Sequence, residues 1–264
     1  MNGGTEPVPE EAKLRTPSAS ALDQLTTIGF AVLIALGIRA FVIEPFRIPS
    51  ESMLPTLLVG DHLFVNKFLY GARVPFTALR LPALREPRRG DVVVFEVARQ
   101  EGAIYPADRY PDLPRDRFVK RIVGMPGDTI EVTGRTVKID GVPLDRKVLD
   151  PAFVAPTGHP LQLGVEGLGG RPHSVLEDPA ASLRDHAPSR IEPGRYFMMG
   201  DNRDHSNDSR SWGTVRFEEF KGPAFVLYWS WDWNGSWGEL LRPATWWSLF
   251  SEKMRWERIG DAIQ

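Results

Sequence analysis

Pro45-Phe-Arg-Ile-Pro-Ser-Glu-Ser-Met-Leu-Pro-Thr-Leu57 follows directly on the most apolar part of the chain. If this segment is an extended strand, alternate side chains share one face. The side chains on that face are Phe46, Ile48, Ser50 and Ser52. Pro49 and Pro55 fix φ on either side of the serines and stiffen the backbone. The segment therefore predicts either a polar turn that leaves an apolar element, or a serine nucleophile at a membrane surface whose base comes from elsewhere.

The segment before it is long and apolar. No charged residue occurs from Gln24 to Ile38, and the apolar character continues past Arg39. This length is about the 20 residues that cross a bilayer core, and an arginine near the end can reach the headgroups. We expect a transmembrane helix at residues 23–43, although a buried core helix has a similar composition.

Residues 1–22 are rich in Pro, Glu, Ser and Ala without apolar periodicity, which predicts a disordered tail. The tail has no basic residue next to the apolar run, and no small-residue cleavage pattern follows that run. The helix is therefore expected to stay as an anchor. Two basic residues flank it on each side, so the positive-inside rule leaves its orientation open.

The composition of the 264 residues is that of a globular protein, and the formal net charge of −2 argues against a nucleic-acid partner. The 23 prolines and 24 glycines favour a turn-rich β structure. The sequence contains no cysteine, which excludes disulfides, thiolate zinc sites and a cysteine nucleophile. We expect a mainly β protein, with residues 44–264 as an antiparallel β domain.

Asp116-Arg-Phe-Val-Lys-Arg-Ile-Val-Gly124 has apolar residues on both faces of a predicted strand, as strands buried on both sides do. Lys120 and Arg121 lie in its middle. Either both side chains reach the rim, or one of them is held in a dry site. An arginine there keeps its proton and needs a carboxylate, whereas a desolvated lysine can become neutral. Lys120 is therefore the candidate general base.

Other strands are expected along the chain. Gly-Asp turns lead into strands at Val59–Gly71 and Arg89–Phe95, and Thr129–Leu144 alternates like a hairpin with Asp140-Gly141 as its turn. A strand at Arg195–Met199 runs into the polar loop Gly200–Gly213. The charges of that loop alternate in sign, which predicts internal ion pairs.

The region at about 145–189 is long, rich in Pro, Gly and His, and weakly periodic. We expect a β-rich insertion there whose structure the pattern does not define. Its histidines at positions 159, 173 and 186 match no zinc spacing, so neither a metal nor a cofactor is expected.

Seven of the eight tryptophans lie between Trp229 and Trp256. Tryptophan prefers the headgroup layer of a membrane. This region therefore either contacts the membrane interface or forms an ordinary core or protein contact.

Several catalytic signatures are missing from the sequence. It has no G-x-S-x-G, H-E-x-x-H, G-x-x-x-x-G-K or S-x-x-K motif. A Ser-His-Asp triad through His62 or His205 is conceivable, and a Ser-Lys dyad is another known solution for nucleophilic acyl transfer.

Four motifs, in this order, resemble the motif series of bacterial type I signal peptidases. They are Ile48–Leu57, Arg89–Phe95, Phe118–Asp128 and Gly200–Arg210. The ending Arg255–Gly260 is similar to the final strand of that family. The resemblance extends from about Pro45 to Gly260 and leaves out Asp145–Ser189.

The resemblance implies that Ser52 is the nucleophile and Lys120 the general base of a serine endopeptidase that forms an acyl-enzyme. It also implies an oxyanion hole made by the Ser52 N–H and the Ser50 hydroxyl. Ser206 matches the serine that orients the lysine amine. Structural ion pairs are implied for Arg121 with Asp201 and for Asp208 with Arg210. Implied substrate-pocket residues are Phe46, Ile48, Met53, Leu57, Phe118 and Val119.

Glu51 departs from the family, because several members have a small residue there, and we expect it to point away from both serines. His205 and Asn207 vary the polar loop at positions expected to face solvent.

The family removes signal peptides from exported preproteins after small-x-small motifs, and the peptide binds as an added strand. The resemblance thus implies preprotein and lipid-bilayer partners and a position near the export translocon. The tail would be cytoplasmic, with the catalytic domain on the outer, periplasmic side of the bacterial inner membrane. The alternatives are a specialised maturation peptidase of the same fold and a non-catalytic, membrane-tethered binding module.

Overall fold

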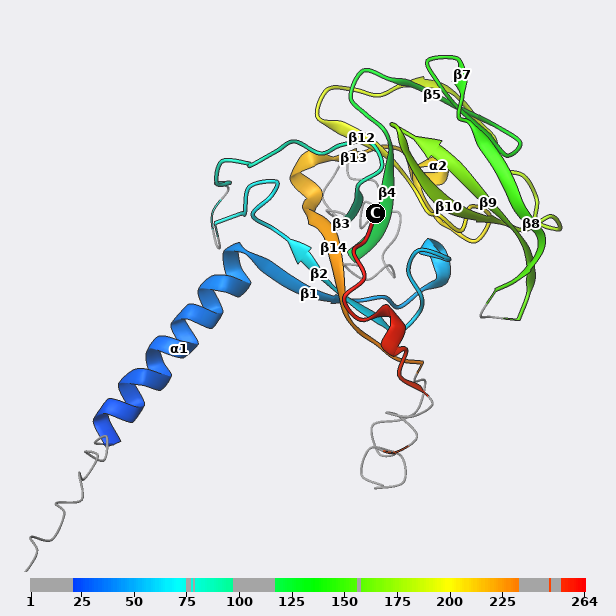
Figure 1. The fold of residues 1–264 in the computed structure, drawn as a ribbon. Coiled ribbons are helices and arrows are strands. Elements are labelled where there is room, and N and C mark those ends of the chain that lie inside the picture. Colours follow the sequence, from blue (N-terminus) through cyan, green and yellow to red (C-terminus); the bar gives the residue numbers. More distant parts are fainter. Residues whose placement is uncertain are drawn as a thin grey trace, which may run out of the picture. The chain divides into compact units, whose positions relative to one another are not determined.

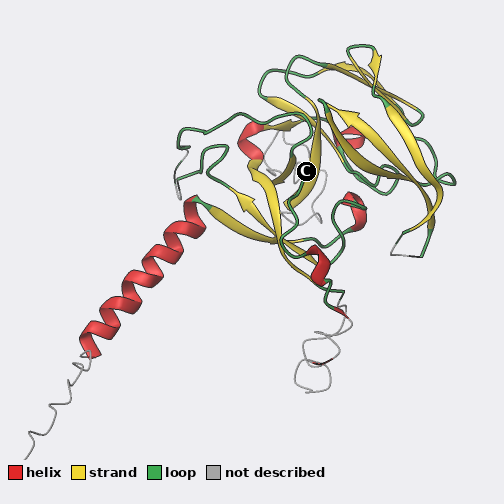
Figure 2. Cartoon of the chain, viewed as in Figure 1, coloured by secondary structure: helices red, strands yellow, loops and turns green. Residues whose placement is uncertain are grey.

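The computed structural model describes residues 21–74, 77, 79–96, 117–155, 158–232, 247 and 253–264. The predicted tail, apart from its last two residues, and most of the tryptophan-rich region lie outside the described residues. Among the described residues, strands predominate (Figure 2), so the prediction of a mainly β fold is confirmed.

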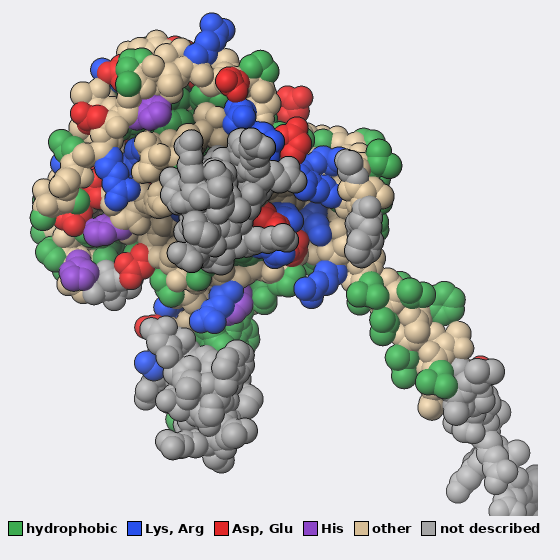
Figure 3. Space-filling model, turned by 180° about the vertical axis from the view of Figure 1, so that it is seen from behind, with side chains coloured by type: hydrophobic (Ala, Val, Ile, Leu, Met, Phe, Trp, Pro, Cys, Tyr) green, Lys and Arg blue, Asp and Glu red, His purple; other side chains and the backbone are tan. Residues whose placement is uncertain are grey.

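One apolar helix, α1 (Ala21–Phe41), precedes the strands (Figure 1). Within it, Asp23–Phe41 has a mean hydropathy of 1.7, and none of that segment is buried. Its apolar side chains lie on the surface (Figure 3), as a membrane anchor requires. The helix ends two residues before the predicted boundary, because Ile43 already pairs with Asn66 in the first strand.

The largest sheet has seven strands, and every pairing within it is antiparallel. In spatial order they are β1 (Ile43–Arg47), β2 (Asp61–Asn66), β14 (Phe220–Ser230), β3 (Val92–Glu96), β4 (Arg117–Gly124), β12 (Arg195–Met199) and β13 (Val215–Arg216). Consequently β4, which carries the candidate base, lies between β3, which pairs with its first half, and β12, which pairs with its second half.

A four-stranded sheet is formed by strands that lie in sequence between β4 and β12 of the main sheet. Its strands, in spatial order, are β11 (His186–Arg190), β5 (Thr129–Thr133), β6 (Thr136–Ile139) and β7 (Val142–Pro143). The turn between β6 and β7 has positive φ at both Asp140 (53°) and Gly141 (79°). A type I′ turn needs positive φ at both central residues, which explains why this dipeptide closes the hairpin.

The inserted region forms a three-stranded sheet of its own, made of β10 (Arg171–Glu177), β9 (Pro160–Leu168) and β8 (Arg146–Val154). The pattern was weak because most of β8 is exposed, so its apolar residues do not alternate with polar ones. The end of the region belongs elsewhere, since β11 pairs with β5.

The predicted extended strand through both serines is wrong. β1 ends at Arg47, and Ser52 lies in the short 3-10 helix η1 (Glu51–Met53). Ile48 still continues the ladder, its N–H donating to the Asp61 carbonyl at 2.8 Å. Pro49 has no N–H to extend the pairing, so the chain turns there. The predicted final strand is also replaced, by the 3-10 helix η5 (Trp256–Arg258) and isolated bridges.

Two further short helices complete the described elements, α2 (Ser209–Trp212) and η2 (Phe217–Glu219). The core next to η1 is an apolar cluster from β1 to β4 and β14. Its buried members are Ile48, Met53, Leu57, Leu63, Val65, Val92, Val94, Val119, Ala224 and Leu227. This cluster places the η1 turn beside the middle of β4, where Lys120 lies.

Candidate active site

Ser52 is the second residue of η1 and is half-buried. Its hydroxyl lies 3.4 Å from that of Ser50, so the two hydroxyls share one site. The first N–H groups of a 3-10 helix have no acceptor within the helix. Among the described residues, the Ser52 N–H has no hydrogen-bond acceptor. An unused donor and two hydroxyls therefore gather at this turn.

Lys120 contacts this turn directly. Its Nζ donates to Ser52 Oγ at 2.5 Å, and its side chain is only 3% exposed. Burial lowers the pKa of Lys120 to about 8, although Asp208 and Asp201 oppose this effect. A lysine with this pKa is partly neutral near physiological pH and can accept a proton from the serine.

Strand alternation sends the two neighbouring cations to opposite sides of β4. Lys120 turns to Ser52, whereas Arg121 turns to Asp201, with Nε–Oδ1 and Nη2–Oδ2 distances of 2.8 and 2.7 Å. Burial alone would raise the pKa of Asp201, but the Arg121 charge outweighs it and the pKa is lowered. Neither side chain reaches the rim, so the rim alternative is wrong.

The second expected ion pair is also present. Arg210 binds Asp208 through Nε–Oδ1 and Nη2–Oδ2 contacts of 2.8 Å each. Asp208 also accepts from the Gly200 N–H at 3.1 Å. Burial raises the pKa of Asp208, but Arg210 and the other hydrogen-bond donors together lower it by more, so the pKa lies below its ordinary value. The polar loop therefore contains an internal ion pair, as its alternating charges predicted.

Ser206 lies at the floor of the site, 1% exposed. A Cβ atom at Gly200 would overlap both the Ser206 hydroxyl and the Ser52 carbonyl oxygen, so only glycine fits between them. Within the described part of the chain, the Ser206 hydroxyl has no partner at hydrogen-bonding geometry. The predicted contact with the Lys120 amine is thus not formed, and the nearby hydroxyl contributes instead to the low pKa of Asp208.

The expected pocket residues separate into two groups. Ile48, Met53, Leu57 and Val119 are buried together in the cluster beside Ser52, with Phe46 packed against it. Phe118 packs instead against Phe95 and Trp212, at ring-centroid distances of 5.8 and 6.5 Å. Alternation along β4 is the reason, since adjacent residues of a strand face opposite sides.

His62 and His205 do not contact Ser52. His62 Nδ1 lies 3.1 Å from the Gly60 carbonyl, and His205 Nε2 lies 3.2 Å from Asp178. Neither histidine hydrogen-bonds Ser52, so a Ser-His-Asp triad is not assembled. In the described ranges, no group of three or more His, Asp or Glu side chains is placed to hold a metal ion.

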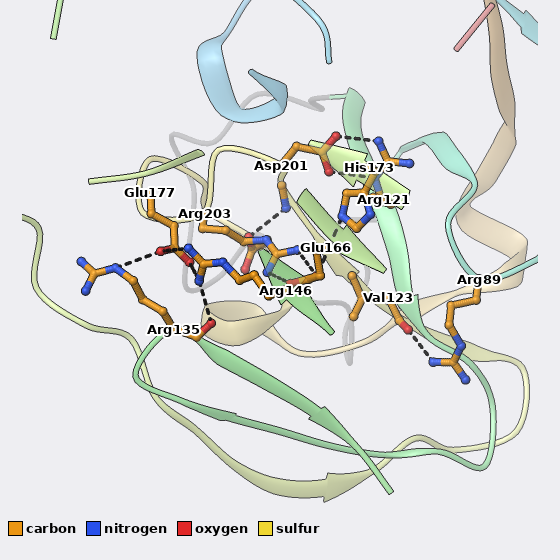
Figure 4. A network of polar contacts seen from close by, with 12 residues as sticks. Arg89, Arg121, Val123, Arg135, Arg146, Glu166, His173, Glu177, Asp201 and Arg203 are labelled. Atoms are coloured by element: carbon orange, nitrogen blue, oxygen red, sulfur yellow. Dashed lines mark hydrogen bonds and ion pairs between the residues drawn. The ribbon is translucent and has the colours of Figure 1, made fainter. Parts of the chain in front are cut away.

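Sequence reasoning missed Asn202, which contacts the turn, and the ion pair between Arg203 and Glu166. Asn202 contacts the backbone of the η1 turn, and Arg203 binds Glu166 (Figure 4). Asn202 and Arg203 lie in the polar loop that the sequence marked as tightly bonded. No local signal identifies Glu166, because its partner is 37 residues away.

A model of the family described as "Signal peptidase, peptidase S26" matches residues 21–229, which include the whole site described above. Signal peptidase I of Pseudomonas fluorescens is 38% identical over 217 residues, covering 76% of this chain and 70% of its own length. Signal peptidase I of Pseudomonas aeruginosa is 38% identical over 219 residues, with the same coverage of 76% and 70%. That of Leptolyngbya laminosa is 33% identical over 228 residues, covering 85% of this chain and 88% of its own length.

Proposed function

Because this chain belongs to the S26 family of signal peptidases, and so removes signal peptides as a signal peptidase I, we propose that Ser52 and Lys120 are its catalytic dyad. One observation carries this assignment. The Lys120 amine, 3% exposed, lies 2.5 Å from the Ser52 hydroxyl. A candidate base must be within hydrogen-bonding reach of the proton it removes and must have a pKa near the working pH, and Lys120 meets both conditions.

In acylation, neutral Lys120 takes the proton of Ser52 Oγ while this oxygen bonds to the scissile carbonyl carbon. The C–N bond then breaks, and the leaving amine receives the proton from Lys120. In deacylation, the lysine removes a proton from water, whose oxygen attacks the ester. The ester bond breaks and Ser52 regains its proton, so the dyad returns to its starting state.

The oxyanion of each tetrahedral intermediate would be bound by the Ser52 N–H and the Ser50 hydroxyl. Support comes from the unused Ser52 N–H and from the 3.4 Å between the two hydroxyls. Loss of one such donor typically lowers kcat by about 100- to 1,000-fold.

For the substrate, we assign a signal peptide with small side chains one and three residues before the cut. The buried cluster of Ile48, Met53, Leu57 and Val119 supports this choice, because it leaves little depth beside Ser52. β1 is an edge strand of the main sheet, and β12 pairs with β4 only from Arg121 onward. Both edges have backbone groups with which an extended peptide can pair.

The anchor is assigned to α1, with the N-terminus in the cytoplasm and the catalytic domain on the outer face of the inner membrane, near the export machinery. The support for an anchor is a 19-residue segment of mean hydropathy 1.7, none of which is buried. Such a helix would keep the enzyme where signal peptides leave the bilayer.

The dyad is tested with Ser52→Ala and Lys120→Met, assayed on a precursor with an Ala-x-Ala cleavage site by mass spectrometry of the products. Both variants should fold and leave the precursor intact. Lys138→Met, on β6 away from the site, is the matched control and should cut at the wild-type position. Near-normal turnover by either dyad variant would refute the assignment.

A further inference from the structure

Asn202 binds the turn that carries the nucleophile. Its backbone N–H donates to the Ser52 carbonyl at 3.2 Å, and its side-chain Nδ2 donates to the Glu51 carbonyl at 3.1 Å. Asn202 is 1% exposed, so water does not compete for these two bonds. One residue thus holds the peptide units on both sides of the serine.

The bond to the Glu51 carbonyl has a geometric consequence. The carbonyl of Glu51 and the N–H of Ser52 belong to the same planar trans peptide, so they point in opposite directions. The Glu51 carbonyl accepts from Asn202 Nδ2 and also from the Leu54 N–H, at 3.0 Å, and holding it there fixes the Ser52 N–H toward the other side. That N–H is the proposed oxyanion-hole donor, and its direction decides how well it binds the developing charge.

Asn202 is in turn held by the inserted sheet. Leu176 of β10 donates its N–H to the Asp201 carbonyl and accepts from the Arg203 N–H, both at 2.8 Å. These bonds form a parallel bridge between Leu176 and Asn202. Leu176 also shares an apolar cluster with Leu54, two residues after the nucleophile.

A buried ion pair fixes the next residue of the loop. Arg203 binds Glu166 of β9 at 2.8 Å (Nη1–Oε2) and 2.5 Å (Nη2–Oε1), and both side chains are almost fully buried (Figure 4). Burial raises the pKa of Glu166, but the Arg203 charge outweighs it, so the pKa is lowered and the carboxylate stays charged. Bidentate pairs of this kind set orientation as well as distance.

We infer that Asn202 is a positioning residue that aims the Ser52 N–H, and that the sheet β8–β10 braces it through Leu176 and the Arg203–Glu166 pair. This inference rests on the proposed function of Ser52. It gives the inserted region a part in the reaction, because that region holds the oxyanion hole in shape.

The first test is Asn202→Ala, which removes the bond to Glu51 and keeps the backbone bond to Ser52. We expect kcat to fall about 10- to 100-fold with KM within about twofold, a smaller loss than complete removal of a donor gives. The pH midpoint of kcat should stay at the wild-type value, because the burial of Lys120 is unchanged. A midpoint that moved upward would show instead that water had reached the lysine, and would overturn the inference.

A double-mutant cycle with Ser50→Ala separates positioning from general damage. Two changes that impair the same oxyanion hole should together cost less than the product of their separate effects on kcat. A fully multiplicative loss overturns the inference. If Asn202→Ala does not fold, Asn202→Ser replaces it, since its hydroxyl is too short to reach Glu51. Asn207→Ala, an exposed asparagine of the same loop, is the matched control and should keep the wild-type kcat.

The brace is tested with Glu166→Gln, which keeps the shape of the side chain and removes its charge. We expect lower kcat, and less than multiplicative loss when it is combined with Asn202→Ala. Ser52→Ala is assayed in parallel. If Ser52→Ala stays active, the proposed function fails, whereas wild-type kcat in Asn202→Ala beside an inactive Ser52→Ala overturns the inference alone.

Discussion

Burial of Lys120 lowers the pKa of its amine, and this shift controls the pH at which the amine can act as a base. Its pKa of about 8 in the folded protein lies below the ordinary 10.5, mainly because the site excludes water. The amine is protonated and idle well below pH 8, and it is neutral and basic above it. We therefore expect kcat to rise with pH through about 8 and then level off. A pH–rate profile on a soluble peptide measures this, and a flat profile from pH 6 to 9 would contradict a lysine base.

The same pKa shift has a consequence for stability. Between pH 8 and 10.5 the unfolded chain keeps the lysine proton while the folded protein has lost it. Because the unfolded state then binds more protons, the contribution of Lys120 to the free energy of unfolding rises with pH across this window. Wild type should thus gain stability relative to Lys120→Met between pH 7.5 and 10. Urea unfolding of both proteins at the two pH values tests the sign, and a constant difference would be evidence against the lowered pKa.

Asp201 balances the charge of the Arg121 guanidinium, which stays protonated. Arg121 is 2% exposed, and within the described residues Asp201 is its acidic partner, so we expect Asp201→Asn to destabilise the protein by about 3–5 kcal/mol. Glu192→Gln is the control. The Glu192 side chain pairs with Arg195 and is 73% exposed, so loss of this pair should lower the free energy of unfolding by about 0–1 kcal/mol. Denaturant unfolding measures both, and equal losses would show that burial does not decide the cost.

At the scale of elements, the contact between η1 and the inserted sheet is apolar as well as polar. Leu54, 2% exposed, packs with Ala155, Leu161 and Leu176. Leu54→Ala should lower the free energy of unfolding by about 2–5 kcal/mol and lower activity, because a cavity opens two residues from the nucleophile. Leu149→Ala, on β8 and 53% exposed, should change stability by no more than about 0.5 kcal/mol. If the two leucines proved equivalent, this packing would not matter to the turn.

The elements show what the sequence can and cannot predict. Lys120 was identified because, of the two adjacent cations, only the lysine can lose its proton. This difference between lysine and arginine does not depend on the fold. The turn at Ser52 was not, since strand alternation gives no warning that pairing stops after Ile48. The sheet β8–β10 was equally hidden, because an exposed strand such as β8 has no apolar period. Glu166 lies too far in sequence from Arg203 for any pattern to join them.

At the scale of the molecule, the helix is predicted to matter for location and not for chemistry. A protein lacking residues 1–41 should cleave short peptides at the wild-type rate and membrane-bound precursors poorly. The cut must stop there, because the Val42 carbonyl accepts from the Lys67 N–H at 2.9 Å and Ile43 begins β1. Rates on a soluble peptide and on a precursor in vesicles measure the effect, and equal efficiency on both would remove the case for an anchor.

The fold class and the apolar helix were predictable because composition, alternation and length act over many residues at once. Sheet order was not, since β14 inserts between β2 and β3 although it comes last in the chain. That placement depends on pairings between residues far apart in sequence, such as Val65 with Ala224.

Because the side chains of Lys120 and Arg121 point in opposite directions, the activity of the enzyme depends on the register of β4. If β4 slid by one position between β3 and β12 so that residue 121 took the place of residue 120, a permanently protonated guanidinium would arrive at the serine, and the apolar Ile122 would face Asp201. The net charge of the protein would not change, yet the reaction would have no acceptor for the first proton. One-residue insertions or deletions in the turn after β4, at residues 125–128, are therefore expected to abolish cleavage.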